Sequence, residues 1–262
     1  MIISSPKMPV LFVGHGNPMN AIEENNFTKT WKQIGINIPI PQSILCISAH
    51  WETHGTYLTA MSQPRTIHDF GGFPRELFEV QYPAPGNPAL AVDIKQKLSQ
   101  GEVELDYSEW GLDHGAWSVI KHIYPKADIP IVQLSLNQNQ SPKQHYELAK
   151  ELAFLRQKGI LIIGSGNIVH NLRTVDWNNM DSGFDWALEA NEQMKSWIAD
   201  RNHQELINFQ KQGKAFDLAI PTTEHYLPLL YTLALQDKSD EISFFNDELV
   251  MGSLSMTSVM IG

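Results

Sequence analysis

Residues 10–18 read VLFVGHGNP, four apolar residues that run into a glycine-flanked histidine, His15. The same order recurs in ILCISAHW, residues 44–51, and in ILIIGSGNIVHNL, residues 160–172. Short apolar runs rich in β-branched residues, followed by polar residues or glycine, are typical of buried strands. The three runs therefore predict strands with His15, His50 and His170 at or just beyond their carboxyl ends.

Amphipathic segments lie between the apolar runs, so that strands and helices alternate along the chain. Helical periodicity is clearest in residues 142–157 and 186–199, and we expect Ser141 to cap the first of these helices and Gly159 to end it. The predicted strands are residues 9–13, 43–48, 57–61, 129–136, 160–163 and 254–261. This pattern predicts an α/β fold with a central mixed sheet flanked by helices and a site in the loops at the strand ends.

The chain has the length of one or two domains, and its composition is that of an ordinary globular protein. It has 262 residues, of which 42% are hydrophobic and 18% charged. We find no fixed-period repeat, low-complexity segment or long polar linker. We therefore expect one catalytic domain over residues 1–262.

The charge and hydropathy of the chain favour small molecules as its binding partners. The formal net charge is -10 and the 19 basic residues are scattered, which disfavours nucleic acid and anionic membranes. Because the chain has no long apolar run and its first residues lack the pattern of a secretory signal, we expect a cytoplasmic protein. The single cysteine, Cys46, cannot form an internal disulfide, and its apolar surroundings predict a buried thiol of low reactivity.

A fourth histidine of interest, His225, lies in PTTEHYLPLLY, residues 221–231, where residues 221–223 are expected to cap a helix that begins at His225. Sheet topology can bring it together with His15, His50 and His170, and several imidazoles suit zinc, iron or copper. A single histidine at a strand end is more commonly a hydrogen-bonding loop residue. The recurrence of the context favours one divalent metal ion bound by these four residues.

The segment GLDHGAW, residues 111–117, admits two interpretations. Asp113 could orient His114 for proton transfer, or it could cap the following helix with His114 in the first turn. The glycine-containing loop around His68, TIHDFGGFP, could cover a pocket. His122 and His145 lie in helical patterns, which predicts surface or packing roles.

Taken together, these motifs resemble the class III extradiol dioxygenase superfamily, most closely its DOPA 4,5-dioxygenase branch. The resemblance extends from residue 11 almost to the C-terminus through LFVGHGNPMN, SAHW, IHDFGGFP, YPAPG, WGLDHGAW, PIVQLS, GSGNIVHNLR, PTTEHYLPLLY and GSLSM, in that order. It implies a single α/β domain with one metal ion, a catecholic substrate such as DOPA, and O2 as the second substrate.

By the same resemblance, His15 and His50 correspond to metal ligands and His225 falls in the motif of a late ligand. His170 is the metal-proximal histidine, a ligand or the base that takes a proton from the catechol, and His114 is a substrate-facing acid or base. The two proton-transfer roles are interchangeable at this point.

One departure bears on the metal. Better-known relatives bind Fe(II) with two histidines and a carboxylate, whereas the late motif here offers His225 preceded by Glu224. An all-histidine site suits Zn(II) as well as Fe(II), which leaves a zinc-dependent hydrolase as the main alternative and a noncatalytic metal- or ligand-binding protein as a third. A serine hydrolase is disfavoured, because the sequence has no GxSxG motif.

Overall fold

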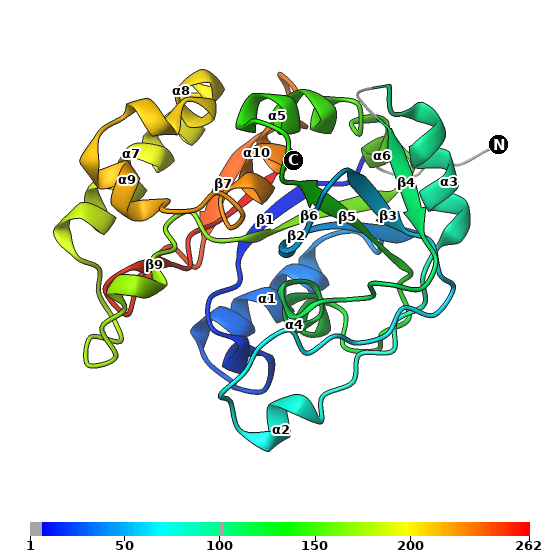
Figure 1. The fold of residues 1–262 in the computed structure, drawn as a ribbon, viewed down its shortest axis with the longest axis horizontal. Helices are drawn as coiled ribbons and strands as arrows, with labels where there is room; N and C mark the ends of the chain where they lie inside the picture. The colour runs from blue at the N-terminus through cyan, green and yellow to red at the C-terminus, as the bar shows by residue number, and fades with distance from the viewer. Residues whose placement is uncertain (1–6, 100–101) are drawn as a thin grey trace.

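An eight-stranded sheet runs through the computed structural model, which describes residues 7–99 and 102–262 (Figure 1). Its strand order is β4-β3-β5-β2-β6-β1-β10-β7. The bounds are β1 (Val10–Gly14), β2 (Ser43–Thr53), β3 (Thr56–Thr59), β4 (Val103–Asp106), β5 (Ile131–Asn137), β6 (Ile160–Gly166), β7 (Ile242–Phe245) and β10 (Ser258–Ile261). The strands β1, β6, β2 and β5 are parallel to one another, whereas β10 and β7 extend the sheet in antiparallel fashion. The sheet is therefore mixed, as predicted.

Helices cover both faces of the sheet, so the strand β1 is buried on both sides. Val10 and Phe12 belong to one apolar core, and Leu11 and Val13 belong to another. The second core is completed by α1 (Asn26–Asn37) and α4 (His114–Ile123), and the first by α3 (Pro88–Lys97), α5 (Pro142–Lys150) and α10 (Leu227–Leu233). The result is a single three-layer α/β domain (Figure 1).

The remaining elements lie around this sandwich. The helices α7 (Asp185–Ala199), α8 (His203–Ile207) and α9 (Lys214–Ala219) gather at one side of the molecule (Figure 1). Short helices are α2 (Arg75–Phe78) and α6 (Phe154–Gln157), and β8 (Leu249–Val250) pairs with β9 (Leu254–Ser255) as a separate ribbon. Within the described part of the chain, no helix has both the length and the apolar character needed to cross a bilayer.

Two predicted elements are each divided in the structure. The helix predicted over residues 142–157 ends at Lys150 and resumes as α6, because the amides of residues 151–153 bond to carbonyls three residues back, which tightens the turn. The strand predicted over residues 254–261 changes partners within its length. Leu254 and Ser255 pair with β8, whereas Ser258–Ile261 pairs with β1 and β7.

Local signals at the start and end of the segment 142–157 are confirmed. Ser141 accepts a hydrogen bond from the Gln144 amide, and the Gln144 side chain accepts one from the Ser141 amide, which forms a capping box. Gly159 adopts a φ of 73°, a left-handed conformation that favours glycine where the chain turns into β6. Cys46 is buried in β2, and burial raises the pKa of its thiol.

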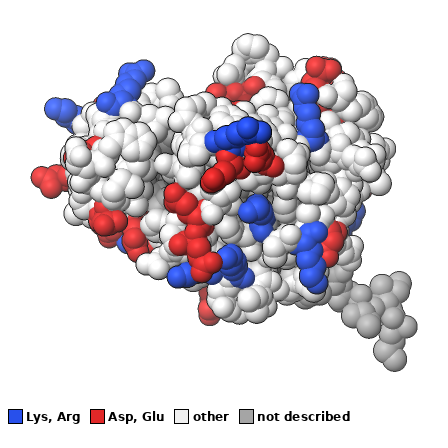
Figure 2. Space-filling model, turned by 90° about the horizontal axis from the view of Figure 1, so that it is seen from below, with Lys and Arg blue, Asp and Glu red and all other residues white. Residues whose placement is uncertain are grey.

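The surface carries charges of both signs in a mixed arrangement. On the face drawn in Figure 2, acidic and basic side chains are interspersed, with wide uncharged areas between them. A continuous basic surface, the usual footprint of nucleic-acid binding, is not seen on that face.

Candidate metal centre

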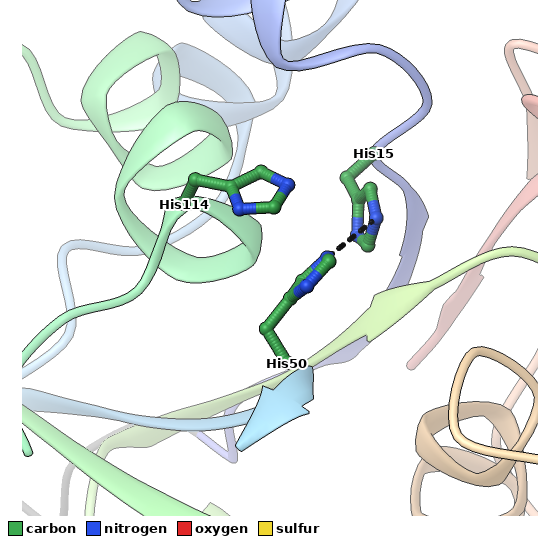
Figure 3. A group of neighbouring side chains, drawn as sticks. All are labelled: His15, His50 and His114. Atoms are coloured by element: carbon green, nitrogen blue, oxygen red, sulfur yellow. Dashed lines mark hydrogen bonds between the residues drawn. The ribbon is translucent and has the colours of Figure 1, made fainter. Parts of the chain in front are cut away.

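The histidines singled out in the sequence converge at the carboxyl ends of parallel strands. His15 follows β1, His50 lies within β2, and His170 follows β6 after a short loop. His225 lies just before α10, and its ring is within 5.2 Å of the His15 ring. His114, the first residue of α4, points toward His15 and His50 (Figure 3). The predicted convergence of these residues is confirmed.

His50 is not in a loop, which differs from the predicted position of the site. The strand β2 continues to Thr53, and its pairing with β5 shifts register between Ile47 and Glu52. The irregularity places additional residues on β2 at the end of the sheet. Bulges of this kind redirect side chains near active sites, and here the bulged segment presents His50 to the site.

His225 does not begin a helix, contrary to the prediction. The amides of Tyr226 and Leu227 both bond to the Thr223 carbonyl, which closes a turn, and α10 begins only at Leu227. The His225 backbone packs closely on the end of β6, where a Cβ on Gly166 would lie 2.1 Å from the His225 carbonyl oxygen. The glycine at this position therefore allows His225 to reach the site.

Three of the rings form a nearly equilateral triangle. The ring centres of His15 and His50 are 5.0 Å apart, those of His15 and His225 are 5.2 Å apart, and those of His50 and His225 are 5.0 Å apart. Imidazoles bound to one tetrahedral ion at about 2.0–2.1 Å from each nitrogen have ring centres roughly 5 Å apart. The spacing of the three rings matches a shared ion.

The Nδ1 atom of each ring in this triangle has its own oxygen partner. The partner of His15 is the Ser165 hydroxyl at 3.0 Å, that of His50 is an Asp69 carboxylate oxygen at 3.3 Å, and that of His225 is a Glu224 carboxylate oxygen at 3.1 Å. The Ser165 hydroxyl donates its only hydrogen to the Gly115 carbonyl, so it accepts from His15. The ionised carboxylates of Asp69 and Glu224 can only accept hydrogen bonds, so the nitrogens of His50 and His225 that face them carry hydrogen. All three imidazoles therefore carry their proton on Nδ1.

This tautomer leaves a lone pair on each Nε2. The Nε2 atoms of His15 and His50 lie 3.3 Å apart (dashed line in Figure 3). That contact is a hydrogen bond only if one of the two nitrogens is protonated, and the Nδ1 partners place the protons elsewhere. Two nitrogens bound to one tetrahedral ion are separated by about 3.3 Å. The pair is therefore arranged to bind a cation.

Burial keeps these imidazoles in the neutral form that binds metal ions. It lowers the pKa of His15 and of His225 well below the usual value, and neighbouring histidines lower both further. The pKa of His50 falls to about 3, chiefly because of burial and then because of His114. Neutral histidines need no deprotonation before they coordinate.

His170 lies beside the triangle and stacks on His225. The two ring centres are 3.5 Å apart and the planes differ by 7°. Burial lowers the pKa of His170 to about 4, while Glu224 opposes that shift. The ligand atoms of His170, Glu224 and His225 form a second close group next to the group of His15, His50 and His114.

The carboxylate beside His114 is not the one expected from its motif. Asp113 caps α4 by accepting from the Ala116 amide, and it also accepts from Ser48 and Gln133. The His114 ring instead lies 2.9 Å from Asp69, which sequence analysis did not single out. The signal was present, because Asp69 follows His68 in the loop TIHDFGGFP.

That loop does line the pocket, although His68 itself does not. Phe70 and Phe73 line a cavity of about 350 Å³ together with the histidines, and the Phe70 ring lies edge to face with His114, whereas His68 contacts the Val80 carbonyl oxygen at 2.9 Å. Further apolar residues also line the cavity, namely Pro18, Leu172, Val175, Trp177, Met251 and Leu254. A pocket of this size with an apolar wall and a polar cluster at its base suits a small aromatic molecule.

The remaining histidines of interest pack inside the protein. His145 is fully buried and contacts the Tyr231 hydroxyl at 2.9 Å, and His122 contacts the Asn20 carbonyl at 2.7 Å. Both lie outside the triangle, in agreement with the predicted packing roles.

Comparison with known proteins agrees with the site. A family model for the catalytic LigB subunit of aromatic ring-opening dioxygenase matches residues 5–259. A protein of Escherichia coli K12 named 4,5-DOPA dioxygenase extradiol is 47% identical over 265 residues, which cover 100% of this chain and 97% of that protein. A protein of the same name from Mirabilis jalapa is 34% identical, with 87% and 86% covered.

A solved structure has the same fold over nearly the whole chain. It belongs to an uncharacterized protein of Escherichia coli K12, superposes with a TM-score of 0.86 at 43% identity, and matches 97% of this chain and 100% of that one. The resemblance seen in the motifs is thus confirmed at full length. The chain belongs to the LigB family of aromatic ring-opening dioxygenases, the class III extradiol enzymes.

Proposed function

We propose that residues 1–262 form one catalytic domain that opens the ring of a catechol with O2, using one divalent metal ion bound by His15, His50 and His225. The observation that carries the proposal is that the rings of His15, His50 and His225 line one pocket with their centres 5.0 to 5.2 Å apart, while the Nε2 atoms of His15 and His50 lie 3.3 Å apart. Family membership favours ring opening over the hydrolytic alternative, which would use the same histidines.

The donor set fits the proposed metal in number and in chemistry. Three neutral imidazoles suit both Fe(II) and Zn(II), and both leave positions for other ligands. We propose Fe(II) as the active metal, because bound iron supplies the redox chemistry through which both atoms of O2 enter the ring. Zn(II) is expected to bind without supporting that reaction.

We assign His170 to proton transfer beside the metal rather than to coordination, with the role of base. The lone pair of an imidazole nitrogen lies in the plane of its ring. Two parallel rings 3.5 Å apart, such as His170 and His225, therefore direct their lone pairs along parallel planes rather than at one ion. A neutral His170 beside the pocket is suited to take a proton from a catechol hydroxyl.

His114 is the proposed acid of the ring-opening step, in which it would return a proton that its Nε2 atom had first accepted from a catechol hydroxyl. Its Nδ1 atom lies 2.9 Å from Asp69, which leaves Nε2 as the nitrogen that can exchange a proton with substrate. Its ring is buried at the start of α4 and lines the same pocket as His170. Two proton-transfer residues in one pocket would serve both the binding of the catechol and the opening of its ring.

The apolar wall of the pocket supports an aromatic substrate. Phe70 and Phe73 offer ring edges and faces for stacking on a catechol, and the relatives from Escherichia coli and Mirabilis jalapa are named for DOPA. We therefore propose a catechol of the DOPA type. A cytoplasmic location, and partners limited to small molecules, remain predictions from the sequence.

The decisive test loads the metal-free protein with Fe(II) under anaerobic conditions and then adds DOPA or simpler catechols together with O2. We expect oxygen uptake, one O2 per catechol, and a yellow ring-opened product. Protein loaded with Zn(II) is the control and should consume no O2. Hydrolysis of esters or amides by the zinc form, without oxygen uptake by the iron form, would select the hydrolase instead.

A further inference from the structure

Asp69 joins two of the converging histidines. One of its carboxylate oxygens, Oδ2, lies 2.9 Å from His114 Nδ1 and 3.3 Å from His50 Nδ1. The other, Oδ1, accepts a hydrogen bond of 2.8 Å from the His114 backbone amide. Among the described residues, Asp69 is the one carboxylate within ion-pair distance of two site histidines.

The carboxylate sets what each ring presents on its other side. An ionised carboxylate only accepts hydrogen bonds, so an imidazole nitrogen that faces it carries the proton. The His114 Nδ1 atom has no partner at hydrogen-bond geometry, but at 2.9 Å from His114 and 3.3 Å from His50 the negative carboxylate favours the tautomer with hydrogen on Nδ1 and a lone pair on Nε2 in both rings. For His50 this is the nitrogen that faces His15 at 3.3 Å, and for His114 it is the nitrogen left for the pocket.

Nearby carboxylates are engaged elsewhere. Asp113 is fully buried and accepts hydrogen bonds from Ser48, Gln133 and the α4 amide of Ala116. Glu224 contacts His225 and the Thr222 hydroxyl. The orientation of both His50 and His114 therefore depends on Asp69. This residue lies in a loop that is distant in sequence from both histidines.

We propose that Asp69 is a positioning residue that fixes the ring orientation and the tautomer of His50 and His114 together, and so links a metal ligand to a proton-transfer residue. The first part concerns the protein alone, and the second rests on the proposed function. Asp69 contacts the proposed ligand and the proposed proton-transfer residue through these two rings and through the His114 backbone amide.

The substitution Asp69→Asn tests the proposal because it keeps the shape and reverses the hydrogen bonding. The amide oxygen can still accept from the His114 backbone, which directs the amide NH2 toward the two rings. An NH2 group donates, so it favours lone pairs on Nδ1 and protons on Nε2, the wrong tautomer for coordination. Asp69→Ala removes the acceptor without adding a donor, and should be less harmful than Asp69→Asn.

We expect Asp69→Asn to lower the affinity for Zn(II) by about 10- to 100-fold, the usual effect of losing a partner that orients a ligand. Turnover of the iron form should fall further at saturating metal, because His114 is misdirected as well. Glu224→Gln changes the partner of His225 and leaves Asp69 in place, so it should lower Zn(II) affinity without changing the tautomers of His50 and His114. Asp93→Asn, at a surface ion pair with Lys158, is the matched control and should change neither.

The measurement that separates this inference from the proposed function is nitrogen-15 NMR of the histidine side chains in metal-free protein, which reports the protonated nitrogen of each ring. We expect Nδ1–H at His50 and His114 in the wild type and a shift toward Nε2–H in Asp69→Asn, with the melting temperature showing that the variant is folded. Unchanged tautomers and unchanged Zn(II) affinity in Asp69→Asn, or greater harm from Asp69→Ala, would overturn the inference. A wild type that opens no catechol would contradict the proposed function and leave the tautomer result standing.

Discussion

The Nε2 atoms of His15 and His50 face each other at 3.3 Å, while the Nδ1 atoms of the same rings face Ser165 and Asp69. Two facing lone pairs in a buried site repel unless a cation lies between them. His15 follows β1 and His50 lies in β2, two inner strands of the sheet, where packing holds the backbones of both residues in place. We therefore expect each Nδ1 partner to affect the affinity for metal.

Replacing a proposed ligand should remove metal and turnover together. For His15→Ala or His50→Ala we expect loss of stoichiometric metal, because two imidazoles remain where three converged. The fold should survive, since the cores on both faces of the sheet are untouched. Metal analysis and circular dichroism check this, with exposed His54→Ala as the control. Full metal content in either variant would remove that residue from the site.

Ser165→Ala should weaken metal binding without removing a ligand. The hydroxyl accepts from His15 and donates to the Gly115 carbonyl, so its loss frees the His15 ring to rotate or change tautomer. We expect the affinity for Zn(II) to fall by about 10- to 100-fold in a competition titration with a chelator. Ser196→Ala on the exposed surface of α7 is the control. An affinity equal to that of the wild type would show that Ser165 does not orient His15.

His114→Ala should keep the metal and slow ring opening. A positioned acid or base contributes a factor of about 10² to 10⁴, so a large loss in single-turnover rate is expected at full metal occupancy. Metal content, catechol affinity and rate should be measured on the same preparation. Unchanged turnover would eliminate His114 as an essential acid, and loss of metal would make it a ligand instead.

His145 should make the metal-free protein more sensitive to acid. Burial lowers its pKa to about 4, whereas an unfolded histidine has a pKa near 6.5. The unfolded chain therefore binds the extra proton first. The stability that neutral His145 contributes is complete above pH 6.5 and is lost as the pH falls toward 4, by roughly 3 kcal/mol in all.

The check is the free energy of unfolding of metal-free wild type and His145→Gln between pH 4 and pH 7. Because glutamine does not titrate, the stability of the wild type relative to the variant should decline steadily below pH 6.5. Metal-free protein is used so that the site histidines contribute alike to both curves. A difference that stays constant over this range would show that His145 is not held neutral by the fold.

Six of the eight strands of the large sheet, all but β4 and β7, and the convergence of the histidines could be predicted from the sequence because both depend on short-range patterns. Apolar runs that end in a histidine recur, and parallel strands bring their carboxyl ends to one edge. The residues at which helices and strands begin and end were harder to predict. Nothing local in residues 142–157 marks the turn at Lys150, and the split of residues 254–261 arises because successive residues pair with different strands.

The partners of the histidines could not be predicted, because they are separated from them in sequence. Asp69 is 45 residues from His114, and Ser165 is 150 residues from His15. Asp113, the carboxylate next to His114 in the chain, is drawn away by Ser48 and Gln133. The sequence suggested an ion pair between Asp113 and His114, which are neighbours in the chain. In the structure His114 pairs with Asp69 instead, because the loop that contains Phe70 packs against it.

The most direct measurement of the central claim is the anomalous diffraction of crystals soaked in Zn(II) or grown anaerobically with Fe(II). The account predicts one strong peak about 2.0–2.1 Å from Nε2 of each of His15, His50 and His225, with the Nδ1 atoms still in contact with Ser165, Asp69 and Glu224. A peak bound through Nδ1, a metal held elsewhere, or no peak at this site would contradict it.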